Sequence, residues 1–78
     1  MKVGAVMEKY MKVLRNQILK EMNNKDWSIT RLSVECGISA RELSYILSGK
    51  KEGLRFSTLV KISDGIGKPV SFLIGENT

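Results

Sequence analysis

Apolar residues recur through most of the chain at steps of three and four positions, which places them on one face of an α-helix. The longest series predicts a helix over residues 3–22, ended by the turn residues 23–26. Its apolar face comprises Val3, Met7, Tyr10, Met11, Leu14, Ile18 and Met22. Glu21 and most of the lysines lie off this face, so we expect them outside the core. Core packing is the expected role of the face, because a small domain can spare few apolar residues; partner binding by this long helix is the alternative.

Four shorter helices are expected downstream, and capping residues mark most of their ends. They span residues 29–36, 40–47, 56 or 57 to 66, and 70–74. Ser28 and Ser39 are suited to N-caps, Gly37 is suited to a left-handed stop, and Gly67 is expected to end the fourth helix. The expected inner positions are Ile29, Leu32, Cys36, Leu43, Ile46, Leu47, Leu59, Val60, Ile62 and Ile66. No stretch of four or more residues alternates as a strand would, so we predict an all-α fold of five helices in a single domain, residues 1–78.

The segment 28–49 is the most informative part of the chain. Two short helices joined only by Gly37, Ile38 and Ser39 cannot lie antiparallel, so the turn forces them to cross steeply. This arrangement is a helix-turn-helix, in which the second helix is turned outward and can enter a DNA major groove. Trp27, just before the first cap, is expected to pack against the domain rather than to stack on bases.

Composition narrows the possible functions. The 78 residues carry a formal charge of +5, which favours a polyanionic partner, nucleic acid before a membrane surface. There is no histidine and one cysteine, Cys36, which we place in the core. Histidine is the commonest general base and a usual zinc ligand, and the chain has none. We therefore expect no enzyme, no metal, no cofactor and no small-molecule ligand. No apolar run approaches the ~20 residues of a membrane span, and we expect a cytoplasmic protein.

The helix-turn-helix segment resembles that of the XRE family, the lambda-repressor-like and Cro-like DNA-binding domains. The resemblance rests on residues 28–49 and continues through Ser48-Gly49-Lys50, Arg55-Phe56, Leu59-Val60-Lys61-Ile62-Ser63 and Ile66-Gly67. It covers about residues 14–75. The resemblance implies a sequence-specific transcriptional regulator, most often a repressor, that binds a palindromic operator as a dimer and excludes polymerase.

The resemblance also implies roles for individual residues. Those that fall where family members reach base edges are Ser39, Ala40, Arg41, Ser44 and Tyr45. Ser48 and Lys50 fall where the loop contacts phosphates, and Arg55 falls where some phage repressors place an arginine at the minor groove. Lys51, beside Lys50, is expected to contact phosphate as well.

The chain departs from the family pattern at several positions. Isoleucine at 29 replaces a glutamine that helps to clamp the DNA backbone, so we expect backbone binding to be weaker or moved to Lys25, Arg31 and Lys51. Ser33 replaces an alanine at the helix crossing, where its hydroxyl can return to a backbone carbonyl. The missing glutamine and the acidic residues near the expected face keep an alternative open, a protein-interaction module such as an antitoxin component.

Glu42 stands three positions after Ser39, which is the spacing of a capping box. In that role its carboxylate would fold back onto backbone N–H groups, and its charge would be used locally. Acceptance of a hydrogen bond from a cytosine amino group is the alternative.

The C-terminal segment is more apolar than a monomer needs. Val70, Phe72, Leu73 and Ile74 fall within five residues, and one face of them must close the core. In the family this helix often pairs across a two-fold axis, so we expect either core packing alone or core packing with a homodimer interface.

Overall fold

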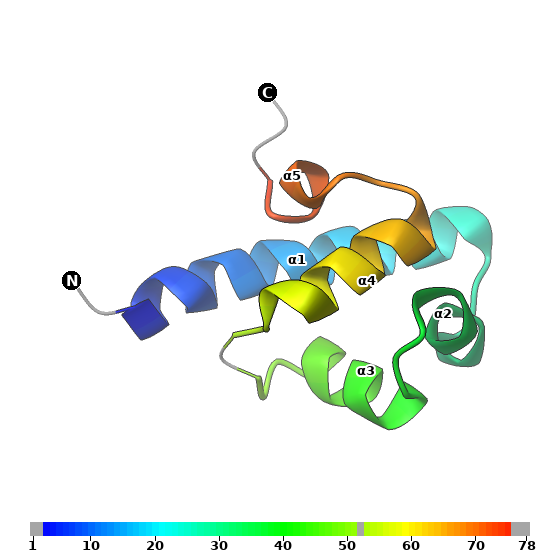
Figure 1. The fold of residues 1–78 in the computed structure, drawn as a ribbon, viewed down its shortest axis with the longest axis horizontal. Coiled ribbons are helices and arrows are strands. Elements are labelled where there is room, and N and C mark those ends of the chain that lie inside the picture. The colour runs from blue at the N-terminus through cyan, green and yellow to red at the C-terminus, as the bar shows by residue number, and fades with distance from the viewer. Residues whose placement is uncertain (1–2, 52, 76–78) are drawn as a thin grey trace.

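The computed structural model describes residues 3–51 and 53–75, with side chains from Tyr10 onward, and within them it is all-helical (Figure 1). The helices are α1 (Val3–Lys25), α2 (Ile29–Cys36), α3 (Ala40–Leu47), α4 (Phe56–Ile66) and α5 (Val70–Leu73). Helix α2 packs against both α3 and α4, and α5 packs against α1 and α4. The predicted five-helix, all-α fold is therefore confirmed, and no helix of the described residues is long and apolar enough to cross a membrane.

One core is shared by all five helices. Its buried members are Met11, Leu14, Ile18, Leu32, Cys36, Ile38, Leu43, Ile46, Ile62, Ile66 and Leu73. The central part of the predicted α1 face is confirmed, while Tyr10 and Met22 are only half-buried. Val3 and Met7 lie where side chains are not described. Ile29, Leu47 and Leu59, predicted as inner positions, are half-buried and pack against the core, whereas Val60 is half-buried but outside the core cluster.

Two details of α1 differ from the prediction. The helix ends at Lys25 rather than Met22, because the left-handed turn falls on Asp26, at φ 57°. Aspartate tolerates this conformation better than most residues. Glu21 is buried, not outside the core, and its carboxylate lies 3.8 Å from the Lys25 ammonium. Its place is three residues after Ile18 and seven after Leu14, which puts it on the apolar face.

Helices α2 and α4 end in the same way. Gly37 adopts the predicted left-handed conformation at φ 68°, Gly67 adopts the same conformation at φ 76°, and each donates its N–H to the carbonyl of the serine four residues earlier. The hydroxyls of these serines donate forward: Ser33 to the carbonyl of Ile38 at 2.6 Å, and Ser63 to the carbonyl of Lys68. Ser33 thus makes the backbone hydrogen bond expected of it.

Helices α2 and α4 approach each other closely at Gly65 of α4, which faces Cys36 at the end of α2. A Cβ atom on Gly65 would fall on Cys36 Sγ and lie 2.8 Å from Cys36 Cα. Because the Cα atom belongs to the backbone, it cannot rotate away. The two helices therefore pack at this distance only with glycine at 65.

Gly65→Ala is predicted to destabilise the domain by about 1–3 kcal/mol, since the added methyl group overpacks the α2–α4 contact. In a free helix the same change would stabilise by about 1 kcal/mol, so the sign of the effect tests the contact. Chemical unfolding of the variant measures it, with Asp64→Ala on the exposed side of α4 as the control. A Gly65→Ala protein as stable as the wild type would contradict the packing.

Burial, with a smaller effect from Glu35, raises the pKa of the Cys36 thiol from 9.0 to about 11. Between these values the unfolded chain loses the thiol proton before the folded chain does. The stabilisation from the buried neutral thiol is therefore complete below pH 9 and is lost as pH rises toward 11.

Cys36→Ala should remove this dependence. Its unfolding free energy should fall less between pH 9 and about 11 than that of the wild type, by an amount on the order of 2 kcal/mol. Urea unfolding across this range measures the difference, and the comparison cancels the titration of lysines and tyrosines. Parallel pH profiles for the two proteins would show that Cys36 ionises as freely in the folded state as in the unfolded one.

Candidate nucleic-acid interface

Helix α3 is held firmly on its inner side and is open on its outer side. Leu43 and Ile46 are fully buried. The Ser39 hydroxyl accepts from the N–H of Glu42 at 3.1 Å, which confirms the predicted N-cap. The equivalent bond at α2 joins Ser28 to the N–H of Arg31 at 3.2 Å. The outer side of α3 is therefore presented by a helix that is fixed at its start and along its buried face.

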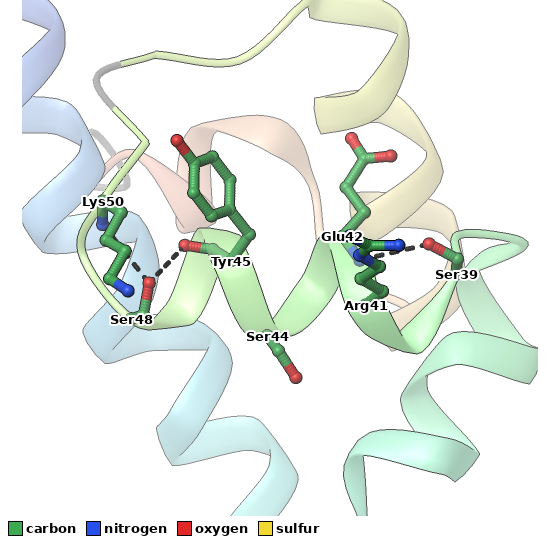
Figure 2. A pocket seen from close by; sticks show the side chains of 7 residues that line it. All are labelled: Ser39, Arg41, Glu42, Ser44, Tyr45, Ser48 and Lys50. Carbon is green, nitrogen blue, oxygen red and sulfur yellow. Dashed lines mark hydrogen bonds between the residues drawn. The ribbon is translucent and has the colours of Figure 1, made fainter.

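A shallow hollow runs along this outer side, and we call it the outer hollow (Figure 2). It is lined by Ser39, Arg41, Glu42, Ser44, Tyr45, Ser48 and Lys50. Six of these seven were predicted site residues. Of the predicted base-contacting residues only Ala40, which is half-buried, does not line it. The structure thus brings together side chains that the sequence assigned to base and phosphate contact.

The C-terminal end of α3 is organised by Ser48. Its hydroxyl donates to the carbonyl of Tyr45 at 2.7 Å and lies 3.4 Å from the N–H of Lys50, which donates to it. The hydroxyl proton is therefore engaged locally, and Ser48 shapes the turn that presents Lys50. Both Lys50 and Tyr45 are exposed.

A second hollow lies between α3 and the start of α4, and we call it the basic hollow. Lys51, Arg55 and Lys61 supply its charge, and Glu42, Gly53, Ser57 and Thr58 complete its lining. Arg55 is the N-cap residue of α4, and its side chain makes no capping hydrogen bond. Lys61 was not predicted, although its spacing from Ser57 places it on the outer side of α4.

Arg15 of α1 adds a further positive charge at the end of α3. Its guanidinium carbon lies 3.6 Å from where a Cβ atom on Gly49 would be. Among the described residues it has no ion-pair partner. Arg15 was not predicted as a site residue, because only the packing of α1 brings it next to a residue so distant in sequence.

The comparisons with known proteins agree with this geometry. A family model described as the Cro/C1-type HTH DNA-binding domain matches residues 17–67, more than half of the chain. This chain belongs to that family. The resemblance found from the residues of the helix-turn-helix is thereby confirmed. Searches of the curated proteins and of the solved structures found no match.

In this Cro/C1-type domain, Arg31 lies outside both the outer hollow and the basic hollow. Its Nε donates to a carboxylate oxygen of Glu35 at 2.7 Å, and its guanidinium lies 5.1 Å from the centre of the Trp27 ring. Lys25 lies 5.5 Å from the same ring. Arg31 lines neither hollow and is paired at the start of α2, and its contact with the DNA backbone stays a prediction.

Glu42 behaves differently from the capping-box prediction. Its backbone N–H forms the Ser39 half of the box, but its carboxylate does not accept from Ser39, and it has no ion-pair partner among the described residues. Figure 2 shows Glu42 and Tyr45 rising from the same side of α3. The carboxylate is therefore available at the surface of this Cro/C1-type domain, where it lines both hollows.

The predicted dimer residues divide into two groups. Leu73 is fully buried, so it serves the core and cannot reach a partner. Phe72 also packs against the core, with the Lys68 ammonium 5.1 Å from its ring centre. Val70 and Ile74 are half-buried but do not belong to the core cluster, so they are the members of the set that a partner could contact.

Acidic and sulfur ligands do not gather anywhere in the described residues. No group of three or more His, Cys, Asp or Glu side chains there could hold a metal ion.

Proposed function

We propose that the protein is a sequence-specific transcriptional repressor that binds a palindromic operator as a homodimer. The observation that supports this most strongly is the outer hollow, where Arg41, Ser44 and Tyr45 stand exposed on a helix fixed by its buried face. A Cro/C1-type domain is a DNA-binding module, and this exposed helix is its means of reading sequence.

In the proposed complex α3 lies in the major groove. Arg41 stands near the N-terminus of α3, the end of a recognition helix that reaches base edges. Its guanidinium can donate to both acceptors of a guanine, O6 and N7. Tyr45, which is 48% exposed, offers a ring for contact with a thymine methyl group and a hydroxyl for a polar contact.

Phosphate contacts come from the cations around α3. Lys50 follows the helix, Arg15 lies beside its end, and the basic hollow supplies Lys51, Arg55 and Lys61. The Lys51 ammonium lies 5.9 Å from the centre of the Tyr45 ring, so the two sets of contacts adjoin. Neutralising phosphates releases counterions, which supplies affinity independent of sequence and makes it depend on salt.

Repression follows from occupancy: a dimer bound over a promoter excludes polymerase and requires no catalytic activity. Val70 and Ile74 of the α5 region provide the proposed contact between protomers.

The charge of +5 suits a protein that acts on DNA. We place the protein in the cytoplasm.

Arg41 and Lys50 should have separable effects. Arg41→Ala is expected to weaken binding to the selected operator by about 1–3 kcal/mol and to relax preference at one base pair per half-site. Lys50→Ala is expected to weaken all duplexes alike and to flatten the log-affinity against log-salt slope by about one unit per lost phosphate contact. Salt titrations on operator and scrambled duplexes measure both effects.

Neither variant should change thermal stability, since both side chains are exposed. An Arg41→Ala protein that keeps the wild-type ratio of operator to scrambled affinity would rule out the recognition-helix assignment. Binding that is indifferent to salt would instead favour a protein partner over DNA.

The dimer is tested by Val70→Lys, which places a charge on the proposed contact while leaving the core intact. The variant should dissociate to monomers in sedimentation equilibrium and should lose affinity for two half-sites spaced ~10–10.5 bp apart, but not for a single half-site. Ser71→Lys adds the same charge at an exposed position of α5 and serves as the control. A wild-type protein that binds its selected sites as a monomer would disprove the dimer.

A further inference from the structure

Among the described residues that line the two hollows, Glu42 is the only one with a carboxylate. It lines both hollows. In the basic hollow it shares the lining with three cations, Lys51, Arg55 and Lys61, yet none of them lies within ion-pair distance of it. The negative charge of Glu42 repels phosphates. It therefore lowers the affinity of the interface for DNA of any sequence.

The position of Glu42 makes base contact possible. It follows Arg41 directly near the start of α3, and its side chain leaves α3 on the same side as that of Tyr45 (Figure 2). The N-cap bond that fixes this turn uses only the Glu42 backbone N–H, so the carboxylate is not needed for capping. A carboxylate accepts hydrogen bonds and cannot donate them, and in the major groove the exocyclic amino group of cytosine is a donor that suits it.

We propose that Glu42 is a specificity-determining residue that discriminates against non-cognate DNA. On the operator its carboxylate accepts a hydrogen bond from the N4 amino group of a cytosine. Where guanine or thymine takes the place of that cytosine, it finds no donor and remains an unpaired anion beside phosphates, which weakens the complex. Glu42 thus favours the operator and disfavours other DNA sequences. Specific interfaces commonly combine such attraction and repulsion. The inference rests on the proposed function, because it requires α3 to read bases.

The test compares Glu42→Gln with the wild-type chain on operator and scrambled duplexes, with the operator first selected from a random library by the wild-type protein. The variant should bind scrambled duplex more tightly and operator no more tightly, so that the ratio of the two affinities falls by about fivefold or more. A selection repeated with the variant should lose its cytosine at one position per half-site. Adenine is the expected replacement, because glutamine pairs best with that base.

Asp64→Asn is the matched control. It removes the same charge from an exposed position on α4 that lines neither hollow, so it should strengthen binding to both duplexes alike and leave the ratio unchanged. Glutamine also suits the third position of a capped helix, so the fold should be preserved, and thermal unfolding of the variant verifies this.

The outcomes separate this inference from the proposed function. If Glu42→Gln changes both affinities in the same proportion as Asp64→Asn, while the wild type still prefers its operator, the role of Glu42 is overturned and the proposed function stands. If the wild type shows no preference among duplexes, both are overturned.

Discussion

The backbone of α4 lies directly against the end of α2 at Gly65, and α2 in turn packs against α3, the proposed recognition helix. Helix α2 packs between α3 and α4, so its position is transmitted to α3 across a turn of a few residues. Cys36 supplies the other side of the contact, and its Sγ lies 3.9 Å from the carbonyl of Ile62 in α4. Any side chain at residue 65 would force a shift at this contact between α4 and the helix that supports α3.

The two halves of the proposed interface are built by different means. The outer hollow is local: its lining comes from residues 39–50, positioned by one N-cap and two buried side chains. The surrounding positive charge is gathered from α1, from the loop after α3 and from α4, and only tertiary packing brings these together. In the proposed complex, base reading belongs to one helix and backbone affinity is distributed over the domain, so we expect that the two can be altered separately.

Local signals explain how much of this could be predicted from sequence. Caps such as Ser28, Ser39 and Gly37 act over one turn, so the helices and their order were predicted almost as observed. The end of α1 was missed, because asparagine and lysine are tolerated in a helix as well as in a turn. Arg15 and the constraint on Gly65 could not be predicted, since each depends on a neighbour distant in sequence. Glu42 satisfied the capping-box spacing, but spacing alone cannot show that its carboxylate points elsewhere.

The central claim, that α3 reads bases from its outer side, is tested most directly by nuclear magnetic resonance. The labelled protein would be titrated with its selected operator and with a scrambled duplex, while backbone amides and the Arg41 side chain are observed. The account predicts that the shifts unique to the operator concentrate on residues 39–45 and the Arg41 Nε signal, while the cations of the basic hollow respond to both duplexes. Operator-specific shifts that fall on the outer side of α2, around the 72%-exposed Val34, and leave α3 unchanged would contradict it.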